Sequence, residues 1–246
     1  MKFLFTFFFL STLLFSCASK KEYLYLQGPS ISNQSTPEYS IKLKNDDLLN
    51  ITILGGDDHS SSLFNSNSSN SNKNEVNKNG YLIDEKGEID FPLIGKVKLA
   101  EHTRSEAIEI LKSKISVYIN NPIINLSIVN FKITILGEVK NPGSFIIPND
   151  RITILEALGL AGDLNITGQR KDVKIIREVN GLISEYIVDL TSKDLLKSPV
   201  YYLKQNDVIY ISPNKSKVNT SAYNPSISIF VSVASLLIST INIISK

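Results

Sequence analysis

Side chains that could do catalytic or metal chemistry are few in this sequence, and their patterns do not suit it. The two histidines, His59 and His102, have no second histidine or cysteine at metal-ligand spacing. Adjacent carboxylates at Asp57-Asp58 and Asp84-Glu85 could in principle serve glycoside hydrolysis, but such pairs are far more often solvated turn residues. No nucleophile elbow or phosphate-binding glycine loop is present. We therefore expect no enzymatic activity, no cofactor and no metal site.

The single cysteine, Cys17, lies where an apolar leader meets a polar stretch. Lys2 is followed by an apolar run that ends at Leu14-Phe15-Ser16, and this pattern resembles a bacterial lipoprotein signal peptide. The resemblance implies cleavage before Cys17 and attachment of diacylglycerol to its sulfur. The next residue is Ala18, not the aspartate that tends to retain enterobacterial lipoproteins at the inner membrane. We expect a signal peptide over residues 1–16 and a lipid anchor at Cys17, with delivery to the outer membrane.

The other end of the chain is apolar but carries one row of polar residues. Their spacings of four, three, four and three would put them on one face of a helix: Ser228, Ser232, Ser235, Ser239 and Asn242. Eighteen helical residues extend about 27 Å, close to the hydrocarbon thickness of a bilayer. The pattern predicts an amphipathic transmembrane helix over residues 226–246, whose polar row lines a pore when several copies form a ring. Two alternatives are a small-residue packing face for dimerisation and a simple tail anchor whose hydroxyls bond back to the helix.

The residues between these ends are enough for two small domains. The 26 basic and 24 acidic residues are nearly balanced and form no long block, so we expect no nucleic-acid partner. Polar composition predicts linkers over residues 17–37 and 214–225, and a mobile Ser/Asn-rich loop over residues 57–79. The first domain is then expected over residues 38–130 and the second over residues 131–213.

Short strands outnumber helices in both predicted domains. The first has a hairpin signal around Glu85-Lys86-Gly87 and a capping box from Thr103 to Glu106 that begins a helix. The second has another capping box, from Thr153 to Glu156, and a hairpin signal at Asn180-Gly181. With one helix across a small mixed sheet in each domain, the fold class is predicted to be α+β.

Three residues are interpreted as determining the backbone conformation of a turn and not as contacting a ligand. Gly137, Pro142 and Gly143 surround a turn in the second domain, and Pro142-Gly143 suits the two central positions of a type II turn. Gly143 would then take a positive φ. Two consecutive aromatic residues further along the chain, Tyr201 and Tyr202, could stack on sugar rings or pack within the protein.

The order of these motifs resembles a known family. The run Gly80-Tyr81-Leu82-Ile83-Asp84 through Phe91-Pro92-Leu93-Ile94-Gly95 is similar to the polysaccharide export domain of outer-membrane capsule and exopolysaccharide export lipoproteins. Ile135-Leu136-Gly137-Glu138-Val139 and Gln205-Asn206-Asp207-Val208-Ile209 resemble the soluble ligand-binding β-grasp (SLBB) domain of the same family. Departures are a single β-grasp copy, Asp163 where a second glycine is frequent, and Asn206 where a glycine commonly precedes the aspartate.

The resemblance implies a homo-oligomeric ring that exports capsular or exopolysaccharide through the outer membrane. Its two domains would lie in the periplasm, the acyl chains would enter outer-membrane lipid, and the tail helices would form a porin-like channel. An inner-membrane polysaccharide co-polymerase is implied as a further partner. The alternative is a monomeric or dimeric surface lipoprotein that binds glycan and uses its tail as a simple anchor.

Overall fold

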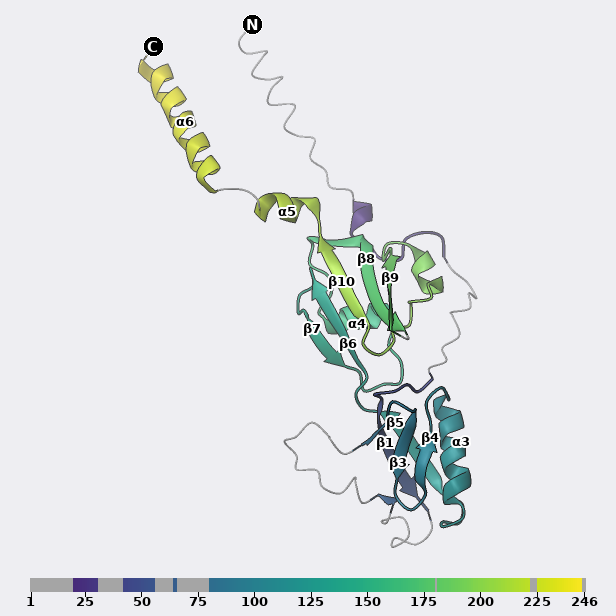
Figure 1. The fold of residues 1–246 in the computed structure, drawn as a ribbon. Helices are drawn as coiled ribbons and strands as arrows, with labels where there is room; N and C mark the ends of the chain where they lie inside the picture. Colours follow the sequence, from purple (N-terminus) through teal and green to yellow (C-terminus); the bar gives the residue numbers. More distant parts are fainter. Residues whose placement is uncertain are drawn as a thin grey trace.

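The structure, a computed structural model, confirms the α+β class and describes residues 20–30, 42–55, 64–65, 80–179, 181–221 and 225–244. Two separate hydrophobic cores are present. One is built from residues between Leu43 and Leu126, and the other from residues between Phe131 and Ile211. Figure 1 shows the corresponding domains stacked end to end.

In its described residues, the first domain contains an antiparallel sheet, a separate hairpin and the helix α3. The sheet has the order β2-β1-β5, β3 pairs with β4, and the element bounds are β1 Leu48–Leu54, β2 Tyr81–Leu82, β3 Glu88–Phe91, β4 Gly95–Lys98, α3 Arg104–Ile115 and β5 Ile123–Ile128. Alternate residues of β1 are buried because successive side chains point to opposite faces of a strand. Ala107, Leu111 and Ile115 of α3 complete the core on that face.

The turn at Gly87 forms as predicted, but the strands beside it do not pair with each other. Gly87 has a φ of 80° and donates its N–H to the carbonyl of Asp84. β2 pairs with β1, whereas β3 pairs with β4. The turn therefore connects β2 of the three-stranded sheet to β3 of the separate β3–β4 hairpin.

The Ser/Asn-rich loop predicted over residues 57–79 is anchored at its two described residues, Phe64 and Asn65. Phe64 is buried, with its ring centroid 6.3 Å from that of Phe91 and 6.0 Å from that of Tyr118. The Asn65 amide donates to the carbonyl of Ile53 at 2.7 Å and accepts from its N–H at 3.0 Å. The prediction of a mobile loop is thus wrong at these positions, because one aromatic residue finds a place in the core; the other residues of the loop lie outside the described ones.

The second domain is a five-stranded mixed sheet with the order β7-β6-β10-β8-β9, in which only β6 and β10 run parallel. The element bounds are β6 Lys132–Gly137, β7 Gly143–Ile146, α4 Ile154–Leu160, β8 Gly168–Val179, β9 Leu182–Val188, the 3-10 helix η4 Lys193–Lys197 and β10 Val208–Pro213. Both predicted capping boxes are present, at Thr103 and Thr153. The predicted β8–β9 hairpin also forms, with a φ of 76° at Gly181.

Composition predicts a linker over residues 17–37, but its described part, residues 20–30, packs on the second domain. A 3-10 helix, η2, covers Lys20–Glu22. Leu26 and Gln27 then donate backbone hydrogen bonds to the carbonyls of Leu190 and Thr191. Figure 1 shows η2 at the end of the second domain that lies away from the first domain.

Two helices follow β10. The predicted linker over residues 214–225 contains α5, Lys215–Ser221, so this prediction is corrected; the hydroxyl groups of Thr220 and Ser221 bond back to the preceding turn. The predicted tail helix forms as α6, Pro225–Ile244. Among the helices in the described part of the chain, none is both long and apolar enough to cross a membrane.

Two buried aspartates at strand entrances follow the same local design. The Asp47 carboxylate, before β1, accepts from the N–H of Lys44 at 2.8 Å, and the Asp207 carboxylate, before β10, accepts from the N–H of Lys204 at 2.7 Å. Asp207 is also paired with Arg177. No ion pair to Asp47 is present among the described residues.

The free energy of unfolding is expected to depend on pH through Asp47. Burial raises the pKa of this carboxyl from 3.8 to about 6. Because the folded state then binds the proton more tightly than the unfolded chain, the contribution to stability is complete below about pH 4 and is lost as the pH rises through about 6. In urea unfolding, the free energy of unfolding of Asp47→Asn relative to wild type should therefore rise by up to about 3 kcal/mol as the pH increases from about 4 to above 6. Parallel stability curves for the two proteins would contradict the prediction.

Candidate functional site

The polar row of the tail is described in part. Ser232, Ser235 and Ser239 are exposed, and so are apolar neighbours on other faces of α6, of which Phe230 is 73% exposed and Leu237 59% exposed. The Ser235 hydroxyl donates to the carbonyl of Ser232 at 2.8 Å, and the Ser239 hydroxyl to that of Leu236 at 2.9 Å. These bonds satisfy the hydroxyl donors in lipid or water, so both a pore-lining face and a simple anchor stay open.

Three predicted site residues are described incompletely or not at all. Cys17 lies outside the described residues. Ser228 and Asn242 belong to the backbone helix of α6, but their side chains lie outside the described ones. Lipidation and pore lining at these positions stay predictions.

The two glycines predicted to shape the backbone in the second domain differ in φ and in the space around them. Gly137 ends β6 with a φ of 92°, and a Cβ built there would lie 2.0 Å from the carbonyl oxygen of Ile211. Gly143 begins β7 without a positive φ, and no heavy atom lies within 4 Å of a Cβ built there. The prediction of a positive φ at Gly143 is therefore wrong.

The connection from β6 to β7 is held by another loop and not by a closed type II turn. Lys140 donates its N–H to the carbonyl of Asp163, and Asn141 donates its N–H to that of Ala161. The backbone before Pro142 is thus fixed by the end of α4. Gly137 is the position where a side chain cannot fit.

The second domain contains a buried ion pair that the sequence did not predict. Arg177 on β8 donates from Nε to Oδ1 of Asp207 at 2.8 Å and from Nη2 to Oδ2 at 2.6 Å. Their side chains are 5% and 0% exposed. Only the alternation of β8, which puts Arg177 on the same face as Val173 and Ile175, could have revealed it.

An aromatic cluster lies beside the start of α4, where Tyr202 forms a β-bridge with Thr153. The rings of Tyr201 and Tyr202 meet edge to face at 5.1 Å, and the Arg151 guanidinium lies 5.7 Å from the Tyr202 ring centroid. Both tyrosines are half-buried. The two rings therefore pack on each other, and Tyr201 also packs against the hydrophobic core, while part of each residue stays accessible.

Metal-binding side chains do not gather in the described residues: no three His, Cys, Asp or Glu side chains could share an ion there. His102 lies near a backbone carbonyl, with Nδ1 3.1 Å from the oxygen of Ala100. His59 lies outside the described residues.

The family of the chain follows from two adjoining matches. Residues 34–129 match the model of the polysaccharide biosynthesis/export protein family, and residues 131–211 match the model of the SLBB domain. The chain belongs to the polysaccharide export family. The expectation drawn from the sequence motifs is confirmed, with the export domain on the first core and the SLBB domain on the second.

Curated relatives of this export-family chain share part of its sequence. It is 30% identical over 102 residues to the EPS I polysaccharide export outer membrane protein EpsA of Ralstonia solanacearum. It is 29% identical over 102 residues to the protein of the same name from Ralstonia nicotianae. Each match covers 40% of this chain and 27% of the relative, so the chain spans about a quarter of the length of the curated relatives that it matches.

Proposed function

We propose that this chain exports capsular or exopolysaccharide across the outer membrane as an oligomeric channel. The observation that carries the proposal is the match of an export domain followed directly by an SLBB domain. The relatives named as polysaccharide export outer membrane proteins support the substrate class and the membrane. In this proposal the chain performs no chemistry on the polysaccharide.

The arrangement of the chain suits a body held in the periplasm by two anchors. η2 begins three residues after Cys17, the proposed lipidation site, and α5 leads toward α6. Figure 1 shows η2 and α5 at the same end of the SLBB domain, opposite the export domain. With diacylglycerol at Cys17 and α6 at the membrane, the SLBB domain would adjoin the outer membrane, and the export domain would face an inner-membrane co-polymerase.

The exit through the membrane is assigned to a ring of α6 helices. A single spanning helix must be apolar all round, but a helix in a ring needs apolar residues only where it meets lipid or its neighbours. The exposed Phe230 and Leu237 suit the lipid side, and Ser232, Ser235 and Ser239 suit the aqueous side. Ser228 and Asn242 extend the same row in sequence. At about 1.5 Å per residue, the 20 residues of α6 extend about 30 Å.

Cysteine scanning of α6 tests the aqueous face. With Cys17 acylated, an introduced cysteine is the one free thiol. Ser235→Cys and Ser239→Cys in intact assembled protein should react with a charged, membrane-impermeant thiol reagent at least about tenfold faster than Leu237→Cys, because thiolates form in water and not in lipid. Equal rates at the three positions would remove the pore from the proposal.

The mass of the complex extracted in mild detergent separates the channel from its alternative. A ring predicts a mass of several times that of one mature subunit, which lacks residues 1–16 and is therefore lighter than the 27.3 kDa of the full sequence, together with bound detergent and lipid. A monomer or dimer would favour a glycan-binding surface lipoprotein with a simple tail anchor. In that second candidate the half-buried Tyr201-Tyr202 pair would be the first place to look for sugar stacking.

A further inference from the structure

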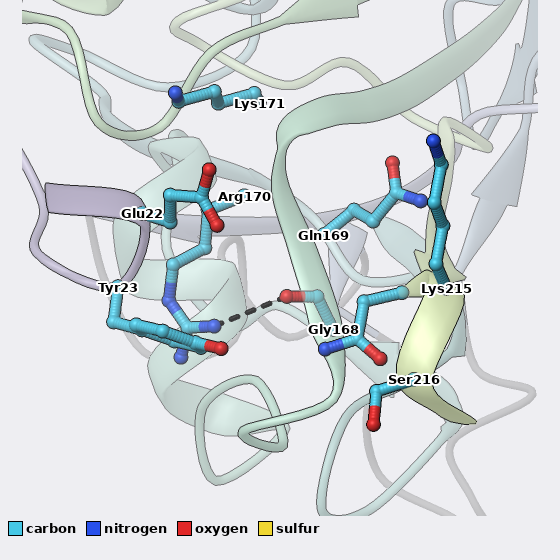
Figure 2. Close-up of a pocket in the computed structure, with 9 residues that line it drawn as sticks. Glu22, Tyr23, Gly168, Gln169, Arg170, Lys171, Lys215 and Ser216 are labelled. Atoms are coloured by element: carbon cyan, nitrogen blue, oxygen red, sulfur yellow. Dashed lines mark hydrogen bonds between the residues drawn. The ribbon is translucent and has the colours of Figure 1, made fainter. Parts of the chain in front are cut away.

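A cavity of 470 Å³ lies at the end of the SLBB domain from which α5 departs. Its lining comes from η2, the start of β8 and the start of α5, including Glu22, Tyr23, Arg170, Lys171 and Lys215. Figure 2 shows Arg170 beside Tyr23 on one side of the strand, with Gln169, Lys215 and Ser216 on the other side. Segments far apart in the sequence thus build one cavity.

Arg170 brings an almost completely buried positive charge to this cavity. Its side chain belongs to a residue only 7% exposed, and Nη1 donates to the carbonyls of Gly168 at 3.1 Å and Asn165 at 3.4 Å. The guanidinium carbon lies 5.6 Å from the ring centroids of both Tyr23 and Tyr25. Its Nε is buried without a hydrogen-bond partner. The aromatic rings and carbonyls orient the guanidinium but leave its charge without a counterion.

No acidic side chain forms an ion pair with Arg170 within the described residues. The Asp163 carboxylate accepts from the hydroxyl of Tyr25 and from the N–H of Leu164. Glu22 lines the cavity but forms no ion pair with Arg170 in the described part of the chain. The lining therefore holds three cationic side chains and one carboxylate. A buried charge without a partner is costly, so an anion in the cavity would recover a large part of that cost.

We infer that this cavity binds the phosphate group of an outer-membrane phospholipid. Phosphate suits a cavity whose lining carries one buried guanidinium and two exposed lysines, because each of its several oxygens can accept a charge-assisted hydrogen bond. The lipid source rests on the proposed function, in which Cys17 and α6 bring this end of the SLBB domain to the membrane. Free phosphate shares the same chemistry, and the test distinguishes the two sources.

Native mass spectrometry of the full chain in a neutral detergent tests the site. Wild type is compared with Lys171→Ala/Lys215→Ala, which removes two exposed cations, and with Lys132→Ala/Lys197→Ala, which removes two exposed lysines elsewhere on the same domain. Added probes are short-chain phosphatidylglycerol, an uncharged diacylglycerol and inorganic phosphate. Phosphatidylglycerol adducts should fall about tenfold in the first variant and stay unchanged in the control. Arg170→Met, if it folds, should lose them as well.

Three outcomes would overturn the inference. Equal adducts in wild type and Lys171→Ala/Lys215→Ala would mean that the cavity holds no lipid phosphate. Equal binding of diacylglycerol would mean that the lipid is held by its chains. Adducts of inorganic phosphate without adducts of phosphatidylglycerol would exclude the lipid as the source. The same spectra count the subunits. A monomer would refute the channel, whereas the effect of the variants on lipid adducts could still be interpreted.

Discussion

Replacing Arg177 by methionine is expected to lower the free energy of unfolding by about 3 to 5 kcal/mol. The Asp207 carboxylate is completely buried and receives both donors of the Arg177 fork, with one further hydrogen bond from the N–H of Lys204. Methionine keeps the apolar stem of the side chain but leaves the carboxylate without its cation. Urea unfolding of the detergent-solubilised protein measures the loss.

Two further variants make this result specific to the buried pair. Lys174→Met breaks an ion pair with Glu185 on the exposed part of the same sheet, where the two side chains are 32% and 46% exposed, and should cost less than about 1 kcal/mol. Arg177→Met/Asp207→Asn also removes the buried, unpaired charge of the Asp207 carboxylate and should be more stable than Arg177→Met alone. A cost as small for Arg177→Met as for Lys174→Met would show that the buried pair adds little to the fold.

The local signals in the sequence were reliable where one residue type has one physical role. The Thr103 and Thr153 capping boxes and the Asn180-Gly181 hairpin form because each depends on neighbours within a few residues. Two of the three departures from the family pattern also follow from a local property of the residue type. Asp163 and Asn206 have φ values of 73° and 65°, and Asp and Asn tolerate the left-handed conformation better than other side chains do.

Features that depend on distant segments could not be predicted in this way. Composition marks the segment around Phe64 as disordered because it counts residues and cannot see that one ring fills a gap beside Phe91 and Tyr118. The Arg170 cavity joins η2, β8 and α5, which are brought together only by the sheet. The pairing of Arg177 with Asp207 spans 30 residues and has no motif of its own.

Gly137 shows how a correct residue can be chosen for an incomplete reason. The sequence favours a tight turn whose glycine is Gly143, whereas the structure puts the constraint at the end of β6. There the backbone of Gly137 pairs with Ile211 of the parallel strand β10, and the N–H of Glu138 donates to the Ile211 carbonyl at 3.0 Å. The two strands approach so closely that no Cβ fits between them.

Gly137→Ala is therefore expected to destabilise the protein by more than about 3 kcal/mol and to prevent assembly. The φ of 92° alone costs an alanine about 1 to 3 kcal/mol, and the contact of 2.0 Å with the Ile211 carbonyl oxygen must be relieved by moving the β6–β10 pair. Thermal unfolding and the mass of the extracted complex measure the two effects.

Gly143→Ala is the matched control, six residues further along the same connection. It has neither a positive φ nor a close neighbour, so alanine there should leave stability unchanged or raise it by up to about 1 kcal/mol. The two glycines thus reverse the order that the type II turn predicts, in which Gly143 would be the sensitive position. A large loss at Gly143 with a small one at Gly137 would restore that turn and contradict the close approach of β6 to β10.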